Sequence, residues 1–473
     1  MRTFTREKKK KPGASRTKAI AAAITAAVAV ATASTALAAP ASASATLAAA
    51  GARQASGAGQ ATAAGQATAA GQVSAAGQVP GAAFRPGSGR LVVTWNKELI
   101  KILGIPGEQP ATVHPTRSFA LLQAAEYDAV NSITHGDRPY LFTVRAPRDA
   151  RPDAAADQAA HDVLAALYPS MRGELGAVLR TELAKIPGRH GRRDGSEVGA
   201  AVARHLLQLR ARDGSAATPP PNASGNLPGD YRPTPPDFPA PAFTGWGKVT
   251  PFVLRDGRQF QPAAPPPVTS AAYAAALNQV KSLGRDTSRT RTARETAAAT
   301  FWASAPIWST WNQVAQDQVR GASLERTTAL LAGLDFTLAD ATIAMYDAKY
   351  HYAVWRPVTA IRLGDTIHNP AIKGDKTWTP LAVTAPDPSY PGAHSTISEA
   401  AATVLSAFDG PRVHLAITLN GVTRTFGSFQ AAANEAGLSR IWAGQHTRLD
   451  HQAGERLGGQ VAAFVLGHFT GRA

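Results

Sequence analysis

Two cationic side chains in the last third of the sequence could bind an anion together. Lys349 and Arg356 are seven positions apart, a spacing that on a helix places both on one face, two turns apart. Pro357 disfavours helical geometry at Arg356, which predicts a guanidinium at a helix end facing a cavity. Arginine donates forked hydrogen bonds and lysine adds a compact charge, so the pair suits an oxyanion. Taken alone, a solvated basic helix face is the alternative.

A histidine follows a turn-forming segment further along the chain. The residues Tyr-Pro-Gly-Ala at 390–393 precede His394, where an apolar helix is expected. Backbone N–H groups at a helix start favour an anion, and a histidine can move a proton near neutral pH. A helix-capping loop with a surface histidine is the ordinary alternative.

A third group lies at 439–451 and contains Arg440, His446 and Asp450. His446 and Asp450 are four positions apart, so the carboxylate can fix the orientation or tautomer of the imidazole. His446 and His451 are five apart, a poor helical spacing for zinc, and the chain has no HExxH motif. The three groups together can neutralise a tetrahedral oxyanion, ligate or attack its centre and move a proton.

Other chemistries lack their residues. The chain has no cysteine, which excludes disulfides, thiolate catalysis and thiolate-bound metals. It also lacks GxSxG, GxxxxGK[ST] and GxGxxG motifs. The formal charge is +16, but eight of the 49 Lys and Arg residues fall within the first 20 positions. No basic stripe with interleaved aromatics follows, so nucleic acid is not an expected partner.

The elements that must position these residues are mostly helical. At 473 residues with 44% hydrophobic content, the chain can form a large core. Sustained β alternation is scarce, apart from a hint of a strand at 252–254 and a hairpin at 413–419 and 422–426 around Asn420-Gly421. We therefore predict an all-α bundle with one small hairpin. Helical spacing of apolar residues occurs at 118–133, 154–167, 172–185, 197–212, 271–281, 291–303, 311–318, 324–349, 394–408, 430–438 and 450–468.

A proline-rich segment at 213–270 interrupts this helical pattern. It holds fourteen of the 34 prolines, and the aromatic residues Tyr231, Phe238, Phe243, Trp246 and Phe252 are among them. A linker between two domains is one interpretation. The interleaved aromatics favour the other, a long loop lying against one domain.

The N-terminal region has the pattern of an export signal. A basic start leads into an Ala-rich apolar run and small-x-small steps, which predicts a signal peptide at 1–45 and a secreted, extracellular protein. An uncleaved anchor is the alternative. Residues 46–85 are a low-complexity Ala/Gly/Gln linker with a six-residue repeat, and the folded domain is expected at 86–473. We found no further apolar run of about 18 residues, so membrane insertion after signal removal is not expected.

The three groups are similar to the signature of the superfamily that joins type 2 phosphatidic acid phosphatases and vanadium-dependent haloperoxidases. That signature is K-x6-R-P, P-S-G-H and S-R-x5-H-x3-D, and the first and third parts match fully. In the second part, Gly392 replaces the serine and Ala393 the glycine. Trp95-Asn96 and the segment 121–131 also resemble bacterial secreted haloperoxidases. The resemblance implies a helical domain whose catalytic part spans about 322–473.

The resemblance implies a role for each residue. His446 would coordinate vanadate, and Lys349, Arg356 and Arg440 would neutralise its oxygens, with Gly392 and Ala393 beside them. His394 would act as acid and base on hydrogen peroxide, and Lys349 would polarise it for attack by halide. A small organic acceptor would then be halogenated. Vanadium serves as a Lewis acid without a change of redox state.

Two other functions fit the same residues. In a phosphatase, His446 would form a phosphohistidine, oriented by Asp450, and His394 would protonate the leaving alcohol. The long region at 90–349 favours the haloperoxidase, because simple phosphatases of this superfamily resemble a shorter bundle. A lapsed oxyanion-binding protein is the third possibility, since Gly392 loses a serine hydrogen bond worth about 1.5–3 kcal/mol.

Several further residues are candidates for smaller roles. Ser395 is a candidate to compensate for the missing serine of the second motif. His351 and Asp387 are candidates to border the substrate approach. Trp302, Trp308 and Trp311 are expected in the core or lining a channel.

Overall fold

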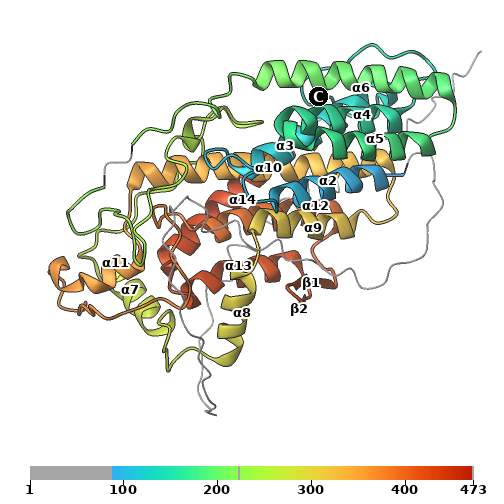
Figure 1. Cartoon of the computed structure of the whole chain (residues 1–473). Coiled ribbons are helices and arrows are strands. Elements are labelled where there is room, and N and C mark those ends of the chain that lie inside the picture. Colours follow the sequence, from blue (N-terminus) through green and yellow to red (C-terminus); the bar gives the residue numbers. More distant parts are fainter. Residues whose placement is uncertain (1–87, 222–223, 471–473) are drawn as a thin grey trace, which may run out of the picture. The chain divides into compact units, whose positions relative to one another are not determined.

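A computed structural model describes residues 88–221 and 224–470 (Figure 1). The predicted signal peptide and low-complexity linker lie outside these residues. The described part contains thirteen α-helices and one two-stranded sheet, which confirms the all-α prediction. The helices before the proline-rich segment are α2 (Arg90–Leu103), α3 (Pro115–Thr134), α4 (Pro152–Leu167), α5 (Arg172–Lys185) and α6 (Arg189–Arg210).

Eight helices follow the proline-rich segment. The first four are α7 (Ala271–Leu283), α8 (Ala293–Ala303), α9 (Ile307–Gln318) and α10 (Leu324–Tyr352). The others are α11 (Pro357–Arg362), α12 (Ala393–Asp409), α13 (Phe429–Trp442) and α14 (Arg448–Thr470). Helices α2 and α11 were not among the predicted segments. Helix α6 begins eight residues before its predicted start, and its added turns pack on the start of α4, where a Cβ at Gly195 would overlap the carbonyl oxygen of Arg151.

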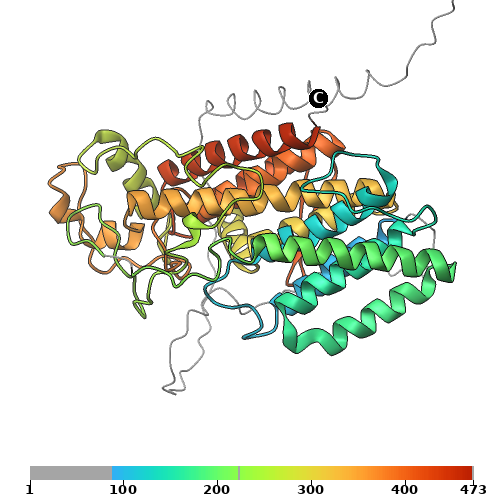
Figure 2. The ribbon, with the colours of Figure 1, turned by 90° about the horizontal axis from the view of Figure 1, so that it is seen from above.

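Helix α10 is the central element of the bundle. It lies between a layer formed by α12 and α14 and a layer formed by α3, α4 and α6 (Figure 2). In the described part, α10 is the one helix that is long and apolar enough to cross a membrane. This finding differs from our expectation that no apolar run of about 18 residues follows the signal peptide. However, 94% of its most apolar 18-residue window is buried inside the protein. Such burial is typical of a core helix, and α10 carries Lys349 to the site.

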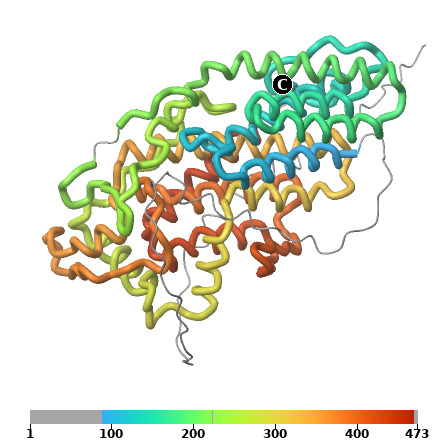
Figure 3. The backbone as a smooth tube through the Cα atoms, viewed as in Figure 1, coloured from blue at the N-terminus to red at the C-terminus, as the bar shows by residue number. Residues whose placement is uncertain are grey.

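The proline-rich segment lies against one end of this bundle (Figure 3). Tyr231 and Trp246 are buried, and the N–H of Tyr231 donates to the carbonyl of Ala353 at 2.6 Å, just beyond α10. The predicted surface-lying loop is therefore correct. The strand hinted at 252–254 is wrong, because these three N–H groups instead converge on the carboxylate of Asp340, at 2.6–2.8 Å.

The predicted hairpin is confirmed. Strands β1 (Leu415–Leu419) and β2 (Val422–Phe426) pair in antiparallel register, with Leu419 opposite Val422. Asn420 and Gly421 both have positive φ, at 49° and 78°, as a two-residue hairpin loop with a type I′ turn requires.

Helices α12 and α14 pack closely enough to exclude a side chain between them. A Cβ at Gly458 would overlap the carbonyl oxygen of Thr396, which belongs to the backbone of α12. A Cβ at the neighbouring Gly459 would have Glu399 side-chain atoms as its nearest neighbours, at an ordinary 3.8 Å. The two helices carry His394 and Asp450, so this close contact fixes the spacing of two parts of the site.

We predict that Gly458→Ala destabilises the protein by about 1–3 kcal/mol, because the backbones must separate. Gly459→Ala is the matched control and should be neutral or stabilising by up to about 1 kcal/mol, since alanine favours helix. Urea unfolding followed by circular dichroism measures both. Equal effects of the two substitutions would show that the contact is not tight.

Candidate active site

Lys349 and Arg356 come from different elements, so the prediction that they share a helix face is wrong. Helix α10 ends at Tyr352, and Ala353 takes the left-handed conformation with φ 46°. Arg356 is the N-cap of α11 in an extended conformation, as Pro357 predicted. Its neighbour Trp355 is buried and donates its indole N–H to Tyr273 at 2.6 Å, which anchors this connection in a small apolar core.

The carboxylate of Asp387 brings the two cations together. Its Oδ1 lies 2.8 Å from Lys349 Nζ and 2.7 Å from Arg356 Nη2. All three side chains are buried. The loop holding Asp387 is fixed by the N–H of Ser389, which donates to the carbonyl of Val354 at 2.9 Å. The sequence alone predicts Asp387 only at the border of the site.

The pKa values of these groups reflect their mutual charge. Burial lowers the pKa of Lys349 to about 8, even though Asp387 acts to raise it. Burial alone would raise the pKa of Asp387, but attraction by Lys349 and Arg356 outweighs it and the pKa is lowered. The carboxylate is therefore ionised at neutral pH and balances one of its two cationic partners.

The third motif supplies His446 from the loop between α13 and α14. Its Nδ1 lies 3.3 Å from the hydroxyl of Ser389 and 3.6 Å from Asp450 Oδ2. Ser389 also donates to Asp450 at 2.8 Å, and the N–H of Thr447 donates to the same carboxylate at 2.6 Å. Asp450 thus orients His446 from the first turn of α14, as the four-residue spacing predicted.

These contacts define the tautomer of His446. Arg356 Nη1 lies 3.2 Å from His446 Nε2, and a guanidinium only donates, so Nε2 accepts and the hydrogen is on Nδ1. Burial, followed by repulsion from Arg356, lowers the pKa of His446 to about 3. A neutral imidazole with a lone pair on Nε2 is the form that ligates or attacks an electrophilic centre.

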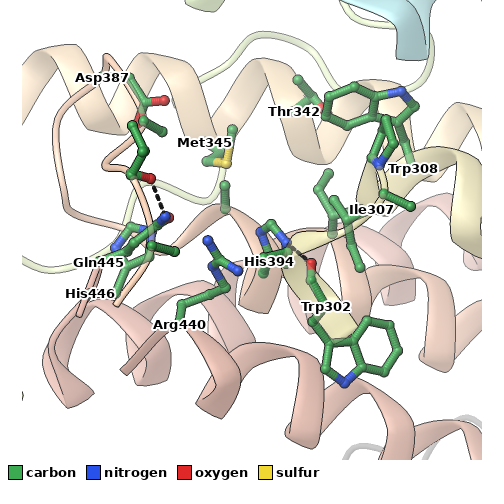
Figure 4. Close-up of a pocket in the computed structure, with 18 of the residues that line it drawn as sticks. Trp302, Ile307, Trp308, Thr342, Met345, Asp387, His394, Arg440, Gln445 and His446 are labelled. Atoms are coloured by element: carbon green, nitrogen blue, oxygen red, sulfur yellow. Dashed lines mark hydrogen bonds between the residues drawn. The ribbon is translucent and has the colours of Figure 1, made fainter. Parts of the chain in front are cut away.

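His394 occupies the first turn of α12. Its Nε2 lies 3.1 Å from the carbonyl oxygen of Trp302, so Nε2 carries the hydrogen and donates. Burial and then repulsion from Arg440 lower the pKa of His394 well below its ordinary value. Nδ1 is left as a proton acceptor. Figure 4 shows the ring between Arg440 and the Trp302 carbonyl.

Arg440 differs from the other two cations. It is buried in the last turn of α13, and burial followed by repulsion from Arg356 lowers its pKa to about 10, so it stays protonated at neutral pH. Among the described residues, no acceptor is within hydrogen-bonding distance of its Nε or Nη1. A buried charged donor without an acceptor is costly, which indicates that these atoms are arranged for an anion.

The second motif offers fewer free hydrogen-bond donors to an anion than its place at a helix start suggested. The N–H of Gly392 donates to the carbonyl of Asp450 at 2.9 Å, so it is not free for an anion. The hydroxyl of Ser395 is 2.9 Å from His451 Nδ1 and is therefore already paired. Ala393 lines the cavity described below and precedes the first helical hydrogen bond, from Thr396 to Gly392. Its N–H belongs to the group that attracts anions at a helix start.

The site residues surround one cavity of about 260 Å³. The residues that line it include Arg356, Asp387, His394, Arg440 and His446. Lys349 is not among the lining residues but contacts one of them, Asp387. The proposed roles of the individual residues remain predictions.

Sequence reasoning missed residues from the N-terminal half. His114 caps α3 and lines the cavity with its ring centroid 4.7 Å from that of Trp308. Tyr346 of α10 lines the same wall. Trp302 and Trp308 line the cavity as expected, while Trp311 lies in the core. His351 is exposed outside the cavity. His114 carried no sequence signal, because it is more than 200 positions from the three motifs.

Comparison with known proteins identifies the fold. Residues 329–472 match the family model of the VCPO second helical-bundle domain. A structure described as the first bacterial vanadium-dependent iodoperoxidase has a TM-score of 0.71 at 23% identity, over 81% of this chain and 97% of that chain. An apo-type bacterial vanadium-dependent chloroperoxidase has a TM-score of 0.60 at 16% identity, over 78% of this chain and 96% of that chain. The described part of the chain therefore has the fold of the vanadium haloperoxidases, and the stretch that matches the family model holds all three motifs.

A third structure agrees with this assignment. The holo-type bacterial vanadium-dependent chloroperoxidase has a TM-score of 0.57 at 15% identity, over 83% of this chain and 95% of that chain. No curated protein matches the sequence.

We predict that three buried histidines stay neutral in the folded protein at pH 5, because burial lowers the pKa of each. The pKa falls to about 3 for His114 and His446 and to about 4 for His451. The unfolded chain takes up these protons near pH 6.5, so their contribution to the free energy of unfolding decreases as pH falls below that value. Imidazole ¹⁵N shifts, recorded by NMR between pH 7 and 5, measure the protonation directly. Imidazolium shifts for all three at pH 5 would contradict the described burial.

Proposed function

We propose that the protein is a vanadium-dependent haloperoxidase that oxidises halide with hydrogen peroxide and halogenates a small organic acceptor. The observation that carries the proposal is the buried Arg440, whose Nε and Nη1 lack an acceptor among the described residues. It lines one cavity with His394 and His446. The haloperoxidase fold supports this choice over other oxyanion enzymes.

The donor set fits vanadate. His446 Nε2 would ligate it, and Arg440, Arg356 and Lys349 would neutralise its oxygens, with the N–H of Ala393 at the start of α12. Within the described residues, no group of three His, Asp or Glu side chains is placed to bind a metal ion, so the cations would hold the oxygens. When bound, vanadate would supply a Lewis acid that activates peroxide towards halide.

The residues of the chain have separate tasks in this proposal. His394 would accept a proton from hydrogen peroxide at Nδ1, because its Nε2 hydrogen is directed to the Trp302 carbonyl. The Ser389 hydroxyl would accept the Nδ1 hydrogen of His446 while it donates to Asp450, and this pair would keep Nε2 directed at the cavity. The aromatic wall of Trp302, Trp308 and Tyr346 would receive the organic acceptor.

The neutral His446 also suits a phosphatase. A lone pair on Nε2 with Asp450 behind the ring is the arrangement that a phosphohistidine nucleophile requires. We place this function second, because the fold matches haloperoxidases over nearly the whole length of those chains.

We expect orthovanadate to be required for bromination of a dione reporter by hydrogen peroxide in phosphate-free buffer. His446→Ala should lower the turnover at least about 100-fold, because the ligating nitrogen is lost. His451→Gln is the matched control, since His451 is also buried but does not line the cavity, and it should keep its turnover. No turnover with any halide, together with vanadate-inhibited hydrolysis of a phosphate monoester, would favour the phosphatase instead.

We also expect Asp450→Asn to weaken vanadate binding about 10- to 100-fold, because His446 loses the carboxylate that orients it. Glu455→Gln is the control, since Glu455 lies 3.4 Å from His451 with the same four-residue spacing. ⁵¹V NMR of bound and free vanadate measures the affinity without turnover. An unchanged affinity in Asp450→Asn would show that Ser389 alone can orient the ring.

A further inference from the structure

Two of the three cations at the site are already paired with groups of the chain itself. Arg356 donates from Nε to the backbone oxygen of Asp387 at 2.6 Å and from Nη2 to its carboxylate at 2.7 Å. Lys349 contacts the same carboxylate at 2.8 Å and also donates to the carbonyl of Pro388. These contacts occupy the donors that an oxyanion would use.

The third nitrogen of Arg356, Nη1, contacts His446 Nε2, the atom expected to ligate the oxyanion. Nη1 lies 3.2 Å from His446 Nε2 and 3.1 Å from the carbonyl oxygen of Gln445. The guanidinium is planar, so its contacts with Asp387 also fix where Nη1 lies. Asp387 therefore holds Arg356 in the position from which Nη1 donates to the lone pair on His446 Nε2.

Arg440 provides the contrast within the same cavity. The described acidic side chains include none that pairs with it, and its Nε and Nη1 have no acceptor. An incoming anion would thus meet one cation ready to bind it and two that are held by a carboxylate.

We propose that Asp387 is a built-in competitor of the oxyanion, which must displace its carboxylate from Lys349 and Arg356 before it can reach His446. The inference rests on the proposed function, because it concerns how the same cavity takes a tetrahedral oxyanion such as vanadate or phosphate. Asp387 thereby sets the affinity of the site and keeps two buried cations paired without a ligand. Its negative charge, at about 3 Å from both, opposes an anion bound between them.

A purely structural role for Asp387 predicts the opposite result. If the carboxylate only positions Lys349 and Arg356 for the anion, its neutralisation should let them separate and weaken binding. Asp387→Asn keeps the shape of the side chain and removes its charge, so it separates the two roles. Asp387→Ser is a second variant that opens more space should the amide be poorly accommodated.

Asp213→Asn is the matched control. Asp213 is also buried and also pairs with two cations, Arg117 at 2.7 Å and Arg210 at 3.2 Å, but it does not line the cavity. It reports the effect of removing a buried bridging carboxylate elsewhere in the protein. Thermal unfolding of each variant establishes that it is folded before binding is measured.

The test is calorimetric titration of the wild-type protein and the variants with orthovanadate, and separately with inorganic phosphate. It is run at pH 6, below the pKa of about 8 of Lys349, so that this side chain is charged. We expect Asp387→Asn to bind both anions at least about tenfold more tightly than the wild type, while Asp213→Asn is unchanged. Because phosphate binds without peroxide chemistry, the result does not depend on turnover.

The other outcomes are distinguishable. Equal or weaker binding by folded Asp387→Asn and Asp387→Ser would overturn the inference and leave the proposed oxyanion site standing. Failure of the wild type and all variants to bind either anion would overturn the inference and the proposed function together. Tighter binding by Asp213→Asn as well would show a general charge effect and would also overturn it.

Discussion

The structure depends on the burial of three cationic side chains in one place. Lys349, Arg356 and Arg440 are almost completely removed from water, at 0%, 1% and 5% exposure. Taking a charge out of water is expensive unless the charge is paired. Asp387 and backbone carbonyls pair Lys349 and Arg356, whereas two nitrogens of Arg440 find no acceptor within the described residues. The account of function follows from this difference.

The helical frame explains how residues so far apart in sequence reach that place. Helix α10 delivers Lys349 through the centre of the bundle, and α12 and α14 bring His394 and Asp450 together through a contact too close for a side chain at Gly458. The N-terminal half of the chain packs against these helices and also contributes a residue to the cavity. His114 lines the cavity wall beside Trp308 of α9. The cavity is therefore built from both halves of the described chain.

Local chemistry was predictable from the sequence, and long-range pairing was not. Pro357 correctly predicted the extended conformation of Arg356, and the four-residue spacing predicted the contact of His446 with Asp450. The shared helix face of Lys349 and Arg356 failed because α10 ends at Tyr352, only three residues beyond position 349, where the helical spacing of apolar residues also ends. The bridging role of Asp387 was missed because it sits in an irregular loop more than 30 positions from Lys349. Gly392 was expected beside the anion, yet only the packing of α12 on α14 shows that its N–H donates to the carbonyl of Asp450.

The central claim is that this cavity is an oxyanion site with His446 as its ligand. Diffraction from crystals grown with orthovanadate, with vanadium located by its anomalous scattering, tests it most directly. The account predicts a single strong peak within bonding distance of His446 Nε2, with Arg440 donating to an oxygen of the same anion. A peak elsewhere in the protein, or a cavity in which Arg440 still has no anionic partner at saturating vanadate, would contradict it.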